Sequence, residues 1–417
     1  MCDVKRVRNA TTISYPPLLL VVLVGICTGD RRQLDLAFSW EGIKFDLGSP
    51  EREMEWSSSG DYIEGQGVPA TLSYFNITSG LTSPLLIPYP NLRMHNVTSG
   101  VMTSVVSVRL DRCNRLWALD AGTVKVGDAQ ERRGATGVHV FDVKTNRILR
   151  SRFFELGDGF QEPEVSTIVV DVTTADCNNA FAYVSDYRNC LLFVYSWRND
   201  FWISHSFFHV DPTLVDFVDD GMRSREARFG VYSLALSQVE KDEFRRLFFS
   251  PFASRVQFIV STRVLRNKTI DVEREAIYEF KMMGNRSPSS QTTAAAFDEE
   301  TGVLFYTLPS NSELKFLSWL LFCRGDEFID STQWSVKGRF RDFAHPIDVR
   351  VDKRGSIWLL NNNYMDILLN MTLPELTTYE IYRAKVRDAS IASKFMIILP
   401  SNKVKKIESL SAFMVIV

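Results

Sequence analysis

The chain has 417 residues, and its 48 Lys and Arg residues against 50 Asp and Glu residues give a formal net charge of −2. This balance excludes a protein that binds nucleic acid through bulk charge, because neutralising phosphates requires a clustered excess of basic side chains. Hydrophobic residues make up 45% of the chain and charged residues 24%, a composition that can bury a sizeable core and that excludes disorder over most of the length.

Residues 1–29 are expected to form a secretory signal peptide. Three basic residues among the first eight precede the apolar run Leu18–Ile26, and residues 27–29 place small side chains at a possible cleavage site. The alternative, a membrane anchor, is disfavoured because nine apolar residues fall well short of the roughly 20 that cross a bilayer. We therefore predict a secreted, extracellular protein with no membrane span.

A weak internal repeat follows. In each copy, a segment of alternating apolar residues ends in a polar turn, and a second segment rich in β-branched or aromatic residues follows. This pattern predicts a β-hairpin in each copy. The turns of the five copies are marked by Asp111, Asp171, Ser237, Asp298 and Asp352, at steps of 60, 66, 61 and 54 residues.

Further strand-like runs lie between these hairpins, at Val138–Val143, Leu191–Trp197, Gln257–Ser261 and Ala276–Phe280. Two hairpins per period make a four-stranded unit, and a fixed period of such units predicts an all-β propeller with long loops. We expect this propeller to occupy residues 30–395 and to be followed by a tail, 396–417, to which the sequence assigns no structure. A sixth copy is expected near residue 51, but one hairpin is missing there.

Six cysteines become four if Cys2 and Cys27 leave with the signal peptide. An even set in an oxidising compartment predicts two disulfides, although four cysteines allow three pairings and buried free thiols are the alternative. No pair has the C-x-x-C spacing of a metal site. The four are Cys113, Cys177, Cys190 and Cys323.

Five Asn-X-Ser/Thr triplets agree with export, because such asparagines are glycosylated on exposed loops of secreted chains. The predicted glycosylation sites are Asn76, Asn96, Asn267, Asn285 and Asn370.

The residue patterns predict no catalytic centre, metal or cofactor. His205 and His209 have i,i+4 spacing, but their aromatic, β-prone surroundings do not place both rings on one helical face. Asp216, Asp219 and Asp220 lack the alternate-residue spacing of a calcium loop, so a solvated loop is expected there.

Seven phrases in order resemble the yellow/major royal jelly protein family of insects, over about Leu34 to Asn363. The resemblance implies a secreted six-bladed β-propeller with a small-molecule pocket at one end of a central channel. The phrases are DLAFSWEGIKFDL (35–47), GVPATLSYFN (67–76), DRCNRLWALDAG (111–122), VFDVKTNRILR (140–150), the segment 180–197, SSQTTAAAFDEETGVLFY (289–306) and DVRVDKRGSIWLLNN (348–362).

The same resemblance suggests ligand residues. Members that bind biogenic amines use an Asn and an aromatic residue from the strand after the last tryptophan, where Asn362 and Tyr364 occupy the nearest positions. An amide oxygen can accept a hydrogen bond from an ammonium group, and an aromatic face attracts the cation. Asn363 replaces the usual Arg, and a polar β-turn is the alternative reading of this stretch. Gln291 could line the channel or bond backbone at a blade edge.

The sequence departs from the family in the first blade. Members carry a strand-turn-strand segment between the equivalents of Tyr62 and Gly67, whereas here Asp61–Glu64 run almost directly into Gly67. The first blade is therefore expected to be incomplete, either as a real difference or through an omitted coding segment. Without an inner hairpin, strand edges would be left unpaired.

Two functions follow from the resemblance. The first is binding of a small aromatic or amine ligand, or a structural role with extracellular matrix components in cuticle pigmentation or eggshell formation. The second is a dopachrome-converting tautomerase of the melanin pathway, which needs a positioned base with a pKa near the working pH. The few histidines supply no such base, so binding is preferred. A lactonase-like propeller, which needs a metal cage, is a third alternative.

Overall fold

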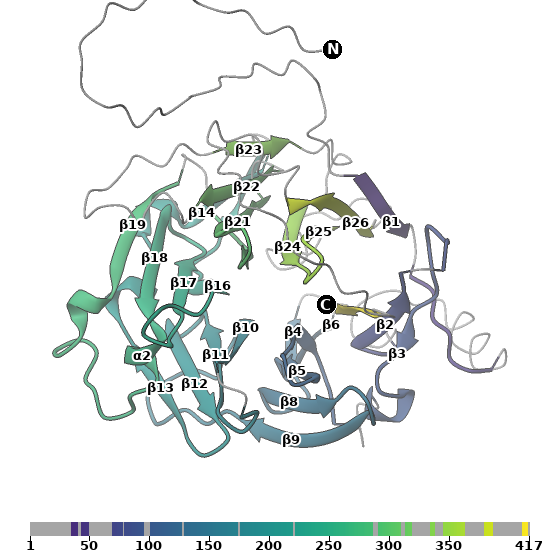
Figure 1. Ribbon diagram of the computed structural model, residues 1–417, viewed down its shortest axis with the longest axis horizontal. Coiled ribbons are helices and arrows are strands. Elements are labelled where there is room, and N and C mark those ends of the chain that lie inside the picture. The colour runs from purple at the N-terminus through teal and green to yellow at the C-terminus, as the bar shows by residue number, and fades with distance from the viewer. Residues whose placement is uncertain are drawn as a thin grey trace, which may run out of the picture.

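The computed structural model describes most of the chain between residues 35 and 415, and the chain is all-β with a β-propeller arrangement of its sheets (Figure 1). The predicted signal peptide lies outside the described residues, as do both expected domain boundaries, which stay predictions. The described residues are 35–40, 43–49, 69–77, 79–95, 101–126, 129–173, 176–219, 222–286, 291–309, 313–318, 334–337, 345–362, 379–386 and 411–415.

Five four-stranded antiparallel sheets are found among these residues, and the first strand of each four-stranded run lies nearest the axis of the ring (Figure 1). The first two sheets follow one another in the chain. One consists of β4 (Val105–Leu110), β5 (Arg115–Asp120), β8 (Gly137–Asp142) and β9 (Arg147–Phe153), and the other of β10 (Val165–Val172), β11 (Ala180–Asp186), β12 (Leu191–Ser196) and β13 (Asp200–Ser204).

The next three sheets continue around the axis. They consist of β16 (Val231–Leu236), β17 (Arg246–Pro251), β18 (Val256–Ser261) and β19 (Lys281–Asn285); of β20 (Ala295–Asp298), β21 (Val303–Leu308), β22 (Glu313–Ser318) and β23 (Trp334–Lys337); and of β24 (His345–Val351), β25 (Ser356–Asn362), β26 (Tyr379–Lys385) and β1 (Asp35–Trp40). Because β1 pairs with β26, a strand from the start of the described chain completes the last of these sheets.

A three-stranded sheet has the order β27 (Ser411–Val415), β2 (Leu72–Asn76), β3 (Ile87–Pro88). Part of the predicted tail is thus a strand. Two small hairpins and five short helical segments occupy the connections. They are β6 (Thr123–Val126) with β7 (Ala129–Arg132), β14 (Asp216–Asp219) with β15 (Met222–Glu226), α2 (Thr262–Leu265), η1 (Leu92–His95), η2 (Ser206–Phe208), η3 (Pro212–Leu214) and η4 (Ile277–Glu279).

The predicted hairpins are present, and an aspartate organises the clearest of them. Asp111 Oδ1 accepts hydrogen bonds from the Cys113 and Arg115 backbone N–H groups, at 2.8 and 3.0 Å, and its Oδ2 accepts from Trp117 Nε1 at 2.9 Å. Asp352 repeats this arrangement, because its Oδ1 accepts from Ser356 N at 2.9 Å and its Oδ2 from Trp358 Nε1 at 2.9 Å. The carboxylate therefore ties the turn to the tryptophan of the following strand.

One repeat marker has a different role. Asp171 lies inside β10, paired with Phe181, rather than in the turn. It is fully buried and forms ion pairs with Arg266 Nη2 at 2.6 Å and with Arg245 Nε at 3.3 Å. Both arginines come from the next sheet's connections, so Asp171 joins neighbouring sheets instead of closing a hairpin.

One predicted strand is wrong. Ala276–Phe280 contains the 3-10 turn η4, and the strand β19 begins at Lys281. The alternating aromatic residues there do not face one side of a sheet, because Tyr278 is 91% exposed whereas Phe280 is buried and stacks on His205. Tertiary packing of Phe280 therefore overrides the local strand pattern.

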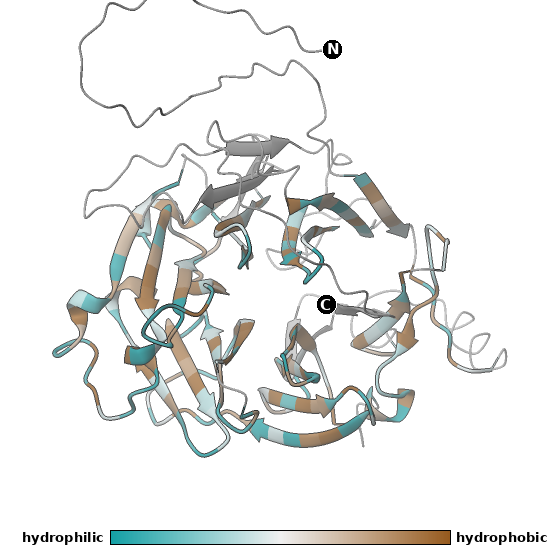
Figure 2. Cartoon of the chain, in the orientation of Figure 1, coloured by the Kyte–Doolittle hydropathy of each residue, from teal (hydrophilic) through white to brown (hydrophobic). Residues whose placement is uncertain are grey.

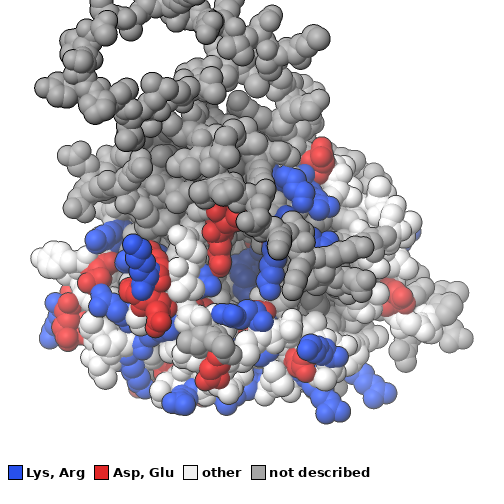
Figure 3. Space-filling model, viewed as in Figure 1, with Lys and Arg blue, Asp and Glu red and all other residues white. Residues whose placement is uncertain are grey.

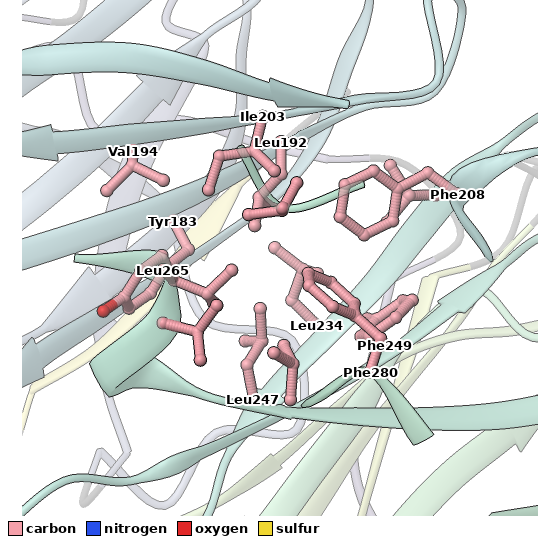
Figure 4. Close-up of a cluster of buried hydrophobic side chains, with 14 of the residues drawn as sticks. Tyr183, Leu192, Val194, Ile203, Phe208, Leu234, Leu247, Phe249, Leu265 and Phe280 are labelled. Atoms are coloured by element: carbon pink, nitrogen blue, oxygen red, sulfur yellow. The ribbon is translucent and has the colours of Figure 1, made fainter. Parts of the chain in front are cut away.

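The hydrophobic core lies between neighbouring sheets. Its largest cluster joins the sheets of β10–β13 and β16–β19, where Tyr183 and Leu192 of one sheet meet Leu247 and Phe249 of the other (Figure 4). Figure 2 shows hydrophobic residues along strands such as β12 and β18 and hydrophilic residues in several connecting loops. Each sheet is thus stabilised mainly by the faces it shares with its neighbours.

The aspartate turn gives a stability prediction. Asp111 and Arg115 form an ion pair at 2.6 Å with side chains only 1% and 7% exposed. Substituting Asp111→Ala leaves the Arg115 charge buried without this partner and frees the Trp117 Nε1 donor, so we expect a loss of about 3–5 kcal/mol in the free energy of unfolding. Chemical denaturation followed by tryptophan fluorescence measures it.

The matched control is Asp142→Ala, which removes the half-buried aspartate at the end of β8, where it accepts hydrogen bonds from Lys144 N and Thr145 Oγ1. The free energy of unfolding of this variant should be close to that of the unsubstituted protein. Equal losses for the two variants would contradict the importance given to the buried turn.

Candidate functional site

The innermost strands β10, β16 and β24 all begin at the same end of the ring, and five aromatic residues gather there. We call Tyr187, Phe217, Phe229, Tyr232 and Phe252 the aromatic cluster. The ring centroids of Tyr187 and Phe229 are 4.9 Å apart, and those of Phe229 and Phe252 are 5.6 Å apart. Four of the five side chains are buried and Phe229 is partly accessible, so the cluster is a packed wall with one accessible member.

Gln291 supports this wall. Its Nε2 donates to the backbone oxygens of Leu214, at 3.2 Å, and of Asp216, at 3.1 Å, and both residues lie within three positions before Phe217. Gln291 is 4% exposed. Gln291 was expected either to line the channel or to bond backbone, and its amide nitrogen bonds backbone. These bonds fix the loop that carries Phe217.

Asn362 lies at the same end. It is the last residue of β25 and pairs with His345, the first residue of β24. The His345 ring in turn makes an edge contact with Phe217, at 6.0 Å between centroids, and its Nδ1 lies 3.0 Å from the oxygen of Pro309. Asn362 is therefore in register with a residue that contacts Phe217, and Gln291 bonds to the loop that carries Phe217, whereas Tyr364 lies outside the described residues.

A second group of polar residues lies further along the innermost strands. Arg109 is on β4, and Asp348 and Arg350 are on β24, with Arg350 Nη2 at 2.8 Å from Asp348 Oδ2. Burial raises the pKa of Asp348 to about 6, and the Arg109 charge opposes that rise. Burial lowers the pKa of Arg109 to about 10, against the effect of Asp348.

The contact with Arg350 also favours the ionised carboxylate of Asp348. Its side chain is 32% exposed, which lets solvent reach it. No local motif in the sequence marks this group, because its residues come from strands more than 200 positions apart.

The two histidines with i,i+4 spacing do not converge. His205 is fully buried, its Nδ1 accepts a hydrogen bond from Phe207 N at 3.0 Å, and its ring stacks on Phe280 at 3.9 Å. His209 is exposed. Asp216 and Asp219 lie on β14, and Asp220 is outside the described residues. Within the described ranges no cluster of three or more His, Cys, Asp or Glu residues could hold a metal ion.

Cys113 and Cys177 form a disulfide with Cα atoms 6.0 Å apart, and it joins the β4–β5 turn to the β10–β11 turn. Cys190 has no disulfide partner among the residues that the structure describes, and Cys323 lies outside them, so the second disulfide stays a prediction. Of the five sequons, Asn76, Asn267 and Asn285 are exposed, and Asn96 and Asn370 lie outside the described part of the chain.

None of the described helices is long and apolar enough to span a membrane. On the face seen in Figure 3, acidic and basic side chains of the described residues are interspersed rather than gathered by sign. That distribution agrees with the near-zero net charge and offers no extended cationic surface in this view.

Comparison with known proteins places the chain among yellow-type proteins. The family model described as major royal jelly protein matches residues 103–394. "Protein yellow" of Drosophila melanogaster is 30% identical over 400 residues, which cover 88% of this chain and 72% of that protein. "Protein yellow" of Drosophila guanche is 29% identical over 398 residues, covering 88% and 68%.

Among solved structures, a protein from Lactobacillus plantarum aligns with a TM-score of 0.38 at 12% identity, over 65% of this chain and 70% of that one. This likeness is too weak to say anything of function.

The buried histidine predicts a pH dependence. Burial lowers the pKa of His205, and protonation of its Nδ1 would remove the hydrogen bond from Phe207 N. The unfolded chain therefore binds the proton more tightly, so stability is fully present above the ordinary histidine pKa of about 6.5 and falls as the pH drops below it. Urea unfolding between pH 7 and pH 5 measures the slope.

The His205→Gln variant should be less stable at pH 7, but its free energy of unfolding should change less between pH 7 and pH 5. His209→Gln, which changes an exposed ring four residues away, should keep the slope of the unsubstituted protein. A His205→Gln slope as steep as that of the unsubstituted protein would mean that other groups cause the dependence.

Proposed function

Because the chain belongs to the major royal jelly protein family, we propose that it is a secreted propeller that binds a small aromatic amine at the end of the ring where the inner strands begin. Its proposed role is in extracellular matrix formation, such as cuticle pigmentation or eggshell hardening. The observation that carries the proposal is the edge contact between Phe217 and His345, because Gln291 holds the loop of Phe217 and Asn362 pairs in register with His345. An amide oxygen and aromatic faces are the groups that recognise an aromatic ammonium compound.

The proposed ring has six blades. Support for this number comes from the five four-stranded sheets together with the three-stranded sheet of β27, β2 and β3, which contacts β4 on one side. Aromatic contacts support its other side, because Phe75 of β2 packs against Phe38 and Trp40 of β1 at 4.9 and 5.4 Å. The small sheet is thus proposed as the blade between those of β24 and β4.

Secretion is supported by two features besides the predicted signal peptide. The Cys113–Cys177 disulfide persists only in an oxidising compartment. The three described sequon asparagines are exposed, as glycosylation requires. Asn267 Oδ1 accepts from Thr269 N and Oγ1 within its own triplet, so that asparagine is presented by an ordered turn.

Asp348 favours the alternative function, a dopachrome-converting tautomerase. Isomerisation of an indole needs a base that is ionised at neutral pH and close to its pKa. Asp348, with a pKa of about 6, meets that condition, and Arg109 and Arg350 could balance negative charge on the substrate. Binding remains the primary proposal, because one carboxylate supplies a base but no group that positions the substrate or returns the proton.

Amine binding is tested by calorimetry with dopamine and serotonin. We expect the unsubstituted protein to bind one or both, and Asn362→Ala to weaken binding about 10- to 100-fold, because a hydrogen bond to a charged group contributes about 1.5–3 kcal/mol. The control is Asn178→Ala, an exposed asparagine in the β10–β11 turn at the other end of the sheet, which should bind as before. No heat of binding with either amine would remove the proposal.

The tautomerase alternative is tested by following dopachrome decay spectrophotometrically. If it holds, the purified protein accelerates the decay with a rate that rises through pH 6, and Asp348→Asn abolishes both the rate and that pH limb. The Asn variant keeps the size and hydrogen-bonding shape of the side chain. A rate no faster than that of heat-inactivated protein excludes the enzyme.

A further inference from the structure

The small sheet is built from two distant parts of the chain. Its central strand β2 pairs with β27 over five consecutive residues, from Leu72 opposite Val415 to Asn76 opposite Ser411. On its other side β3 contributes two pairs only, at Ser73 and Tyr74. Most of the pairing of β2 therefore comes from a strand that follows it by more than 300 residues.

β27 takes the innermost place in that sheet. It contacts β4, the innermost strand of the neighbouring sheet, and Figure 1 draws it in yellow on the side of β2 that faces the axis. In the sheets that begin with β4, β10, β16, β20 and β24, the innermost strand directly precedes its neighbour in the chain. The innermost strand of the small sheet instead follows all the others.

The sequence explains the difference. Ahead of β2, residues Asp61–Glu64 run almost directly into Gly67-Val68-Pro69, and no strand-turn-strand segment is present between them. Among the described residues, the one strand that precedes β2 in the chain is β1, and it pairs with β26 in another sheet. The axis-facing edge of β2 is therefore covered by a later part of the chain.

That edge requires a partner. With β27 in place, Leu72 and Ser73 of β2 are fully buried and Phe75 is 1% exposed, so the β2–β27 pairing lies away from bulk water. A buried backbone group without a hydrogen-bond partner costs about 1–3 kcal/mol. Adding an extended strand satisfies several such groups at once, which is how β-augmentation sites bind peptides.

We propose that the axis-facing edge of β2 is a strand-acceptor site, and that residues 411–415 of the same chain are its resident ligand. The segment Ser411-Ala-Phe-Met-Val415 replaces the inner strand that the local sequence lacks and closes the ring between β24 and β4. The 25 residues between β26 and β27, from 386 to 410, give ample length to reach the site. The site takes an extended, apolar, β-branched or aromatic peptide.

Disulfide trapping in the full chain tests the register. Ser73 pairs with Met414, and opposite Cα atoms in antiparallel strands lie about 4.5–5.5 Å apart, within the span of a disulfide. Ser73→Cys with Met414→Cys should cross-link within one chain under mild oxidation, as shown by a monomer on a non-reducing gel and by the linked peptides in mass spectrometry. Ser73→Cys with Ala412→Cys, displaced by two residues on the same face, should cross-link at least tenfold less.

Equal yields in the two double variants would overturn the proposal. A dimer linked through positions 73 and 414 would overturn the assignment of the ligand to the same chain and show that the strand comes from a second copy.

Peptide binding tests the acceptor site itself. A chain shortened to end at residue 402 should bind a labelled peptide of residues 403–417 in fluorescence anisotropy, at least tenfold more tightly than the full chain, whose site is occupied. The same peptide with Phe413→Pro should bind the shortened chain at least tenfold more weakly, because proline lacks the N–H group and disrupts the strand. Equal binding by the full and the shortened chain would overturn the proposal, independently of whether the protein binds amines.

Discussion

The constraint on which the whole ring depends is that no buried strand edge can be left without a partner. A four-stranded sheet in a ring hides its faces against its neighbours, but its first and last strands still carry unpaired backbone groups. Two pairings between strands that are far apart in sequence satisfy this constraint. β1 covers the outer edge of the β24–β26 sheet, and β27 covers the inner edge of β2. Both ends of the described chain are thereby tied to strands far from them in sequence.

Within each sheet, a different interaction decides where the chain reverses. At Asp111 and Asp352 one carboxylate oxygen binds turn N–H groups and the other binds a tryptophan of the next strand. Ser237, at the corresponding position of another hairpin, forms only the bond to backbone, because its Oγ accepts a hydrogen bond from Arg246 N at 2.8 Å. The turn survives without the carboxylate because the strands still pair on both sides, but the indole contact is lost.

These local interactions explain what the sequence could predict. The hairpins at Asp111 and Asp352 were predictable because the turn, the strand alternation and the tryptophan all lie within about ten residues. The role of Asp171 was not, since Arg245 and Arg266 reach it from the next sheet. The pairing of Cys113 with Cys177 and the covering of β2 by β27 depend likewise on contacts between distant segments. The contact between Phe217 and His345 belongs to the same class, because the two residues lie more than 100 positions apart in the chain.

Gln291 and Asn362 have different surroundings at the end of the ring where the inner strands begin. Both hydrogens of the Gln291 amide can be used on the Leu214 and Asp216 carbonyls, so its nitrogen holds the Phe217 loop and has no donor left for a ligand. Asn362 ends an inner hairpin in register with His345, whose ring makes an edge contact with Phe217. A change at Gln291 would therefore act through the position of the Phe217 loop, whereas a change at Asn362 would act at the end of β25.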